Sequence, residues 1–224
     1  MRLCGKFGPH TKYYPYLLSQ DNFNDPLVIA DDDVLYTRWW LAGLQAAYVH
    51  NPRVVSCYRA HIVRLTHGAV QPYQMWGRCE STEPSFYHFA TGVSGCIYPT
   101  RLLPKLKLAG PDFLQLCPKA DDIWLHANAL RAGFKIRQIH ERPLSFPIVP
   151  GTQSDGLAGQ NVGLAHNDEQ IKRTYTAEDV AILRKDEKAD GFAENASAHL
   201  RRAGSETSVC ACRHNTPDWR QKEL

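Results

Sequence analysis

The chain has 224 residues, of which 43% are hydrophobic and 22% charged, so it is long enough for one domain with a large core. This composition excludes a wholly disordered chain, a collagen-like repeat and a small disulfide scaffold. Lys and Arg total 26 against 23 for Asp and Glu, a net charge of +3. That near balance gives no electrostatic reason to expect nucleic acid as a partner.

Seven cysteines, an odd number, stand mostly within apolar stretches, a pattern typical of buried free thiols in a reducing compartment. No apolar segment follows the charged amino terminus, and no run approaches the ~18 apolar residues that span a bilayer. We therefore expect a cytoplasmic protein without a transmembrane segment. Peripheral contact with a membrane stays open as an alternative.

The predicted elements begin with a strand over residues 27–30, a wholly apolar run that favours a buried, parallel strand. A helix follows, with Thr37 as its cap and Asn51 and Pro52 at its end. Two further strands are expected at residues 54–58 and 61–65. Residues 68–84, rich in Gly, Pro, Gln and Ser, should form an excursion or a flexible loop.

The next strand is predicted at residues 86–90, and it resumes at 96–98 after the sequence T-G-V-S-G. Asp121 should begin a helix that ends before Gly133. A strand at residues 134–139, a short helix from Asn167 and a capping box starting at Thr176 follow. Alternating strands and helices indicate an α/β fold.

Residues 186–224 have mixed charge and few large apolar side chains. Such a stretch buries too little surface to fold, so we expect a domain over residues 1–185 and a disordered polar tail over residues 186–224. On this interpretation, deletion of everything after Lys185 leaves the melting temperature nearly unchanged.

Three adjacent carboxylates, Asp31, Asp32 and Asp33, follow the first predicted strand. Because they repel one another, a counter-charge is needed, and hard oxygen ligands suit Mg²⁺ or Mn²⁺. The end of a buried strand is also where α/β sheets bind ligands. The alternative is an acidic turn that caps the following helix.

A second acidic pair, Asp121 and Asp122, stands at the start of a predicted helix. These carboxylates either cap that helix or hold a general base at the edge of a cleft. Gly92 and Gly95 indicate either a close approach of the backbone to another group or a tight turn. Among ten histidines, His166 is the best candidate ligand for a metal or phosphate, since it precedes a helix.

The order of these features resembles nucleotide-sugar glycosyltransferases of the GT-A fold, in particular the family 2-like bacterial enzymes of cell-surface polysaccharide synthesis. The features are a strand ending in D-x-D at Asp31–Asp33, the T-G-V-S-G stretch and then the pair Asp121–Asp122. The stretch from Gly8 through Pro150 to Asp168 is similar to one group of such bacterial transferases.

The resemblance implies a GT-A-like mixed sheet flanked by helices, and roles for individual residues. Asp33 would bind Mn²⁺ or Mg²⁺, and Asp31 would contact the donor ribose or the metal's water shell. Asp122 would be the general base of inverting transfer. The remaining matches place Asp32, Asp121, Gly92 and Gly95 at the donor or sugar pocket and His166 at the metal or diphosphate.

These matches imply metal-dependent transfer of a sugar from a nucleotide-sugar to a glycan or another hydroxyl acceptor. GT-A domains carry a nucleotide-binding unit before D-x-D, and only 30 residues precede Asp31, so we expect the fold to be incomplete at its amino end. Two alternatives remain, a metal-dependent phosphohydrolase or nuclease and a catalytically vestigial binding protein. An uncovered sheet edge also allows a homo-oligomer.

Overall fold

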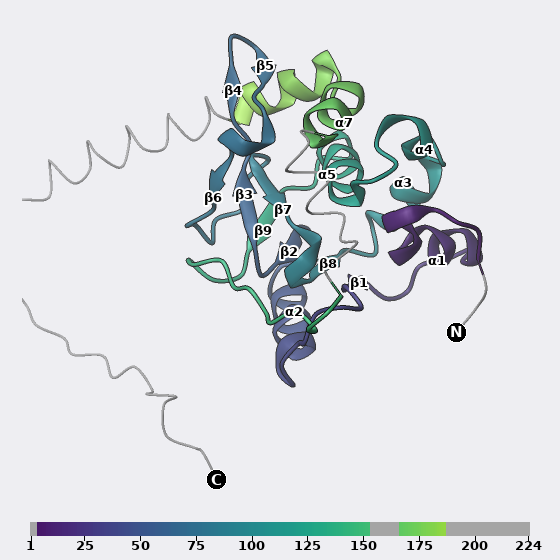
Figure 1. Cartoon of the computed structure of the whole chain (residues 1–224). Helices are drawn as coiled ribbons and strands as arrows, with labels where there is room; N and C mark the ends of the chain where they lie inside the picture. Colours follow the sequence, from purple (N-terminus) through teal and green to yellow (C-terminus); the bar gives the residue numbers. More distant parts are fainter. Residues whose placement is uncertain (1–3, 153–165, 187–224) are drawn as a thin grey trace, which may run out of the picture. The chain divides into compact units, whose positions relative to one another are not determined.

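The computed structural model describes residues 4–152 and 166–186 (Figure 1). The strands in this part of the chain are β1 (Leu27–Ile29), β2 (Val55–Cys57), β3 (Ala60–Ile62), β4 (Leu65–Thr66), β5 (Ala69–Val70), β6 (Gly77–Arg78), β7 (His88–Ala90), β8 (Cys96–Tyr98) and β9 (Ile136–Gln138). The helices are α1 (Tyr14–Ser19), α2 (Trp40–His50), α3 (Leu103–Leu108), α4 (Phe113–Leu116), α5 (Asp121–Arg131), α7 (His166–Thr174) and the 3₁₀ turns η1 (Gly8–Lys12), η2 (Tyr73–Met75) and η3 (Gly92–Ser94). Residues 177–186 are also helical.

The central sheet has the strand order β1-β8-β2-β9. β9 runs parallel to β2, whereas β8 is antiparallel to both β1 and β2. The predicted α/β class is therefore confirmed, with a mixed sheet. The prediction that the first strand is parallel is wrong, because β1 lies at the edge of the sheet and pairs only with antiparallel β8.

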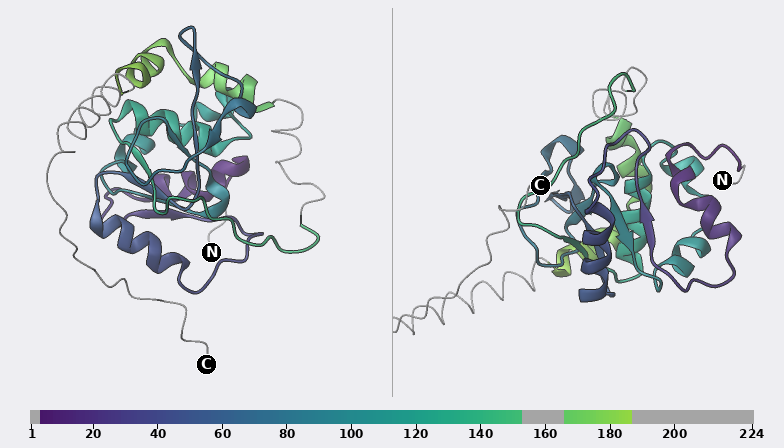
Figure 2. Two further views of the ribbon diagram at one scale, coloured as in Figure 1. Left: turned by 90° about the vertical axis from the view of Figure 1, so that its left-hand side faces the viewer. Right: turned by 90° about the horizontal axis from the view of Figure 1, so that it is seen from below.

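The two faces of this sheet pack on different helices (Figure 2). On one face, Trp40 and Leu44 of α2 pack with Ile97 of β8. On the other face, the neighbouring side chains of β8, Cys96 and Tyr98, join the larger core that contains α3 and α5. Alternation along the strand thus fills both layers.

The helix α2 ends at His50, as the Asn-Pro pair predicts, but it begins three residues after Thr37. Thr37 contributes its main-chain oxygen to the Trp40 amide, and no side chain caps this helix. Leu41, in the first turn of α2, is 45% exposed.

A second sheet has the order β6-β3-β7, and β4 and β5 form a separate hairpin. The prediction of a loop over residues 68–84 is therefore wrong in part, because β5, η2 and β6 fall within it. These strands have two residues each, too few to show an alternating pattern. Mutual hydrogen bonds between Ser85 and Ile136 connect the segment before β7 to β9.

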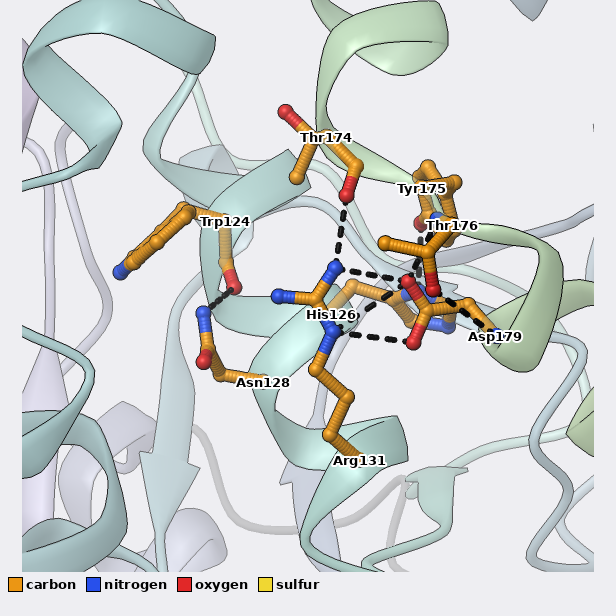
Figure 3. Close-up of polar contacts among 8 residues, drawn as sticks. All are labelled: Trp124, His126, Asn128, Arg131, Thr174, Tyr175, Thr176 and Asp179. Atoms are coloured by element: carbon orange, nitrogen blue, oxygen red, sulfur yellow. Dashed lines mark hydrogen bonds and ion pairs between the residues drawn. The ribbon is translucent and has the colours of Figure 1, made fainter.

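The carboxyl end of α5 is tied to the last described helix (Figure 3). Arg131 makes hydrogen bonds to both carboxylate oxygens of buried Asp179 and to the main-chain oxygen of Thr174. Asp179 also accepts a bond from the Thr176 amide, and its own amide donates to the Thr176 hydroxyl. The predicted capping box is confirmed, with Asp in the usual Glu position.

Asp186, assigned by sequence to the polar tail, is instead held by the core. Its carboxylate lies 2.6 Å from Lys135 Nζ and accepts hydrogen bonds from the Ser85 hydroxyl and the Phe86 amide. The side chain of Asp186 is almost fully buried. Residues 187–224, the rest of the predicted tail, lie outside the described part of the chain.

This contact changes the expected outcome of truncation. Asp186→Asn should lower the free energy of unfolding by about 1–3 kcal/mol, because charge-assisted bonds to a buried carboxylate are lost. That loss corresponds to a fall in melting temperature of a few degrees. Truncation after Lys185 should match it, and truncation after Asp186 should not; equal melting of all three proteins would contradict this.

The structure also bears on the cysteines and on membrane-spanning helices. Cys57, Cys79, Cys96 and Cys117 are buried free thiols, as predicted. No helix among the described residues has the length and apolar character needed to cross a bilayer.

Candidate functional site

The β1–β8 register brings two of the sequence-predicted segments together. Ile29 at the end of β1 lies opposite Cys96 at the start of β8. Because the strands are antiparallel, the loop that follows Ile29 runs beside the segment that precedes Cys96. The acidic loop from Asp31 to Asp33 therefore lies next to the turn η3.

Tyr36 connects these two segments, and we call its two hydrogen bonds the Tyr36 clamp. Its hydroxyl accepts a hydrogen bond from the Asp31 amide and donates one to the main-chain oxygen of Val93, both at 3.0 Å. The tyrosine ring packs on Trp40, with the ring centroids 4.3 Å apart. The position of Asp31 is thus set by the glycine-containing turn as well as by its own strand.

Lys12 joins the third predicted segment to the other two. From the end of η1, its Nζ lies 2.5 Å from Oδ1 of Asp31 and 3.5 Å from Oδ2 of Asp121. A Cβ placed on Gly92 would lie 3.9 Å from the same nitrogen. One ammonium thus contacts the acidic loop and the start of α5, with the glycine turn beside it.

The charges of this cluster are strongly coupled. Burial alone would lower the pKa of Lys12, but the carboxylates of Asp121 and Asp31 outweigh it and raise that pKa. Burial also raises the pKa of Asp121, with Lys12 opposing the shift and Asp31 adding to it. Lys12 therefore stays protonated and is the resident counter-charge of this acidic site.

Asp122 follows Asp121 in the first turn of α5, and its pKa differs strongly from that of an ordinary carboxyl group. Burial, and after it the charge of Asp121, raises the pKa of Asp122 to about 7. One carboxylate oxygen accepts a bond from the Ile123 amide. The two neighbouring acids thus have different surroundings. Asp121 forms an ion pair with Lys12, whereas Asp122 forms none among the described residues.

A small cavity lies beside Asp122, with room for about one water molecule. Its other lining residues come from the two sheets and α5: Val55, Ala90, Tyr98, Leu125, His126, Ala129 and Ile136. His126 donates from Nε2 to the Phe86 carbonyl. Its Nδ1 accepts a bond from the Tyr175 hydroxyl (Figure 3). Both ring nitrogens are therefore engaged in the neutral imidazole, whose pKa burial lowers to about 4.

The two glycines of the turn serve different purposes. Gly95 has φ +96°, and a Cβ on it would lie 2.4 Å from the ring of Trp40. The group that approaches this backbone closely is thus a side chain of the protein itself. Gly92 has no such constraint, and its missing side chain leaves the approach to Lys12 open.

The acidic loop offers carboxylate oxygens of the kind that Mn²⁺ and Mg²⁺ prefer. Oδ1 of Asp31 is buried and, among the residues that the structure describes, has no hydrogen-bond partner apart from the Lys12 ammonium. Asp32 is exposed, and the main-chain oxygen of Asp33 accepts a bond from Val149. Oδ1 of Asp31 already contacts one cation, the Lys12 ammonium.

No group of three or more His, Cys, Asp or Glu side chains suited to a metal occurs among residues 4–152 and 166–186. The structure therefore does not join His166 to Asp31 and Asp33 in such a group. His166 is half-buried at the first position of α7, and its main-chain oxygen accepts a bond from Gln170.

The residue that sequence reasoning missed is Lys12. It stands within the motif G-P-H-T-K-Y-Y, between residues that become buried, His10 and Tyr13. A cation inside a buried aromatic stretch signals an acidic partner, but the sequence does not say which one. The two partners lie 19 and 109 positions further along the chain.

Comparisons of this chain with protein-family models, with curated proteins and with solved structures found no match.

Proposed function

We propose that this chain transfers a sugar from a nucleotide-sugar to a hydroxyl acceptor, with a GT-A-like site and inversion at the anomeric carbon. The observation that carries the proposal is the meeting of Asp31, Gly92 and Asp121 around Lys12. These residues come from three distant segments, and their order along the chain is that of the transferases that the sequence resembles.

In the proposed reaction, Asp122 accepts the proton of the acceptor hydroxyl. The hydroxyl oxygen forms a bond to the anomeric carbon, and the bond from that carbon to the diphosphate oxygen breaks. A pKa of about 7 suits Asp122 to this role, because a general base works best near the operating pH. Lys12 contributes positive charge toward the departing diphosphate.

Asp31 and Asp33 would hold a divalent ion, which supplies further charge neutralisation on the diphosphate when bound. Because Lys12 already contacts Asp31, a second cation there would meet the positive charge of that ammonium, and the negative charge of a diphosphate would offset the repulsion. Metal affinity should consequently be higher in the presence of a nucleoside diphosphate.

Calorimetry on Asp33→Asn tests the metal assignment. Mn²⁺ should bind the parent protein more tightly with UDP or GDP present, and the variant should lose at least tenfold in that affinity, since a charged ligand is removed. The exposed Asp112 provides a matched control as Asp112→Asn. Unchanged affinity in Asp33→Asn would place the ion elsewhere.

Turnover of nucleotide-sugars tests the function itself. The full chain is incubated with UDP-, GDP- and dTDP-sugars, Mn²⁺ and a panel of glycan acceptors, and release of the nucleoside diphosphate is followed. Acceptor-dependent release supports the transferase. Hydrolysis of phosphate esters without an acceptor would favour the phosphohydrolase, and binding without turnover would favour a vestigial binding protein.

A further inference from the structure

A cluster of basic side chains lies on the second sheet, outside the acidic site. His61 on β3 lies directly opposite Arg78 on β6. The flanking pair is hydrogen-bonded, with the Cys79 amide donating to Ala60, so His61 and Arg78 form the closer type of antiparallel pair and project to one face. Arg59 lies two positions before His61, just ahead of β3, and its charge acts on the His61 ring.

No acidic partner neutralises these basic groups within the described part of the chain. Within residues 4–152 and 166–186, neither Arg59 nor Arg78 makes an ion pair. Nδ1 of His61 is buried and has no hydrogen-bond partner there. Burial, and after it the charges of the two arginines, lowers the pKa of His61 to about 4, so the ring is neutral at pH 7. A neutral ring between two guanidinium groups is a hydrogen-bonding partner for an anion rather than a third positive charge.

Two connections lead from the basic cluster toward Asp122. The main-chain oxygen of Arg59 accepts a bond from the Thr91 amide, and Ala90 lines the cavity beside Asp122. The ring of Tyr73 lies 5.5 Å from that of His61. Burial raises the pKa of Tyr73, the charge of Asp122 adds to the increase and that of Arg59 opposes it. Tyr73 is therefore close enough to both Asp122 and Arg59 to be affected by their charges.

We infer that Arg59, His61 and Arg78 bind a phosphate or carboxylate group of the hydroxyl acceptor. This inference rests on the proposed function, which gives the acceptor its place next to Asp122. The donor diphosphate has a cation of its own in Lys12, on the side of Asp31 and Gly92. The acceptor is accordingly an anionic one, held by its charged group while its hydroxyl faces Asp122.

Phosphate binding tests the site without a donor, an acceptor or turnover. Inorganic phosphate is titrated into the full chain, and its dissociation constant is measured by ³¹P NMR. Arg59→Gln and Arg78→Gln should each weaken binding by about tenfold or more, the loss expected for a hydrogen bond between charged groups. Arg78→Lys, which keeps the charge, should recover part of the loss. Arg53→Gln, an equal loss of charge at an exposed position, should leave binding unchanged.

A second titration distinguishes the two sources of the anion. UDP and GDP are titrated into the same variants and into Lys12→Gln, with thermal melting as the check on folding. Weaker binding of the nucleoside diphosphates in Lys12→Gln alone supports the acceptor assignment. An equal loss in Arg59→Gln and Arg78→Gln would overturn it and assign the anion to the donor. Phosphate affinity that neither arginine variant changes would overturn the site itself, whatever the outcome of the turnover assay.

Discussion

Replacing Asp122 by Asn is expected to lower turnover by about 10² to 10⁴, the usual contribution of a general base. The amide keeps the shape of the carboxyl and can still accept the bond from the Ile123 amide, but it cannot take the proton. Binding of the nucleotide-sugar should persist. Asp121→Asn should cost less in turnover, because Asp121 contacts Lys12 and is assigned an orienting role.

The pH profile is the second readout of this prediction. The pKa of Asp122 in the folded chain is about 7, raised from 3.8 by burial and by Asp121. The base form therefore predominates above pH 7, and kcat/KM should fall about tenfold per pH unit below it. An Asp122→Asn protein with normal turnover, or a parent profile flat between pH 5 and 8, would eliminate the base assignment.

Lys12→Met should have the largest effect on stability. It leaves the carboxylates of Asp31, Asp121 and Asp122 close together without their cation. Breaking a buried pair costs about 3–5 kcal/mol, and we expect about 3 because 27% of the Lys12 side chain stays exposed. Thermal melting at pH 7 measures the loss, with Lys105→Met on an exposed part of α3 as the control.

The sign of the pH dependence separates charge from packing. Without Lys12, the folded-state pKa values of the remaining carboxyls rise. A group whose pKa is raised by folding stabilises the fold at low pH and loses that contribution as pH rises through the folded value. The deficit of Lys12→Met should thus be greatest above pH 7 and smaller near pH 5. A deficit of equal size at both values would mean that Lys12 acts through packing of its aliphatic stem.

Local patterns in the sequence predict much of the fold. The helix α5 starts at Asp121, and Gly133 follows its end with φ +77°, as a C′ glycine should. The capping box at Thr176 rests on a four-residue pattern, which is why it could be predicted. The direction of β1 could not, because an apolar run of three or four residues is equally compatible with a parallel and an antiparallel neighbour.

The candidate site likewise has parts that could be predicted from the sequence and parts that could not. Its acidic and glycine-containing segments could be recognised from their composition and order. Their common partner, Lys12, could not, because an ion pair between residues 109 positions apart leaves no periodic trace. The basic cluster was missed for a related reason. Arg59 and His61 are close in sequence, but Arg78 joins them only through the β3–β6 register, within a segment that was predicted to be a loop.

The Tyr36 clamp has a consequence for how this chain can diversify. One hydroxyl is hydrogen-bonded to both the acidic loop and the glycine turn, and the paired residues Ile29 and Cys96 fix the other ends of these segments. The conformations of the two loops therefore depend on each other. Insertion of one residue into either would shift the β1–β8 pairing or break the clamp, and a shift by one reverses which side chains face each layer. If one of these loops were replaced by a loop from another protein, the new loop would not fit the loop that remained. If the proposed transferase activity is correct, new substrate preferences should arise either by replacing both segments together or by substitution at positions such as exposed Asp32, which takes no part in the Tyr36 clamp.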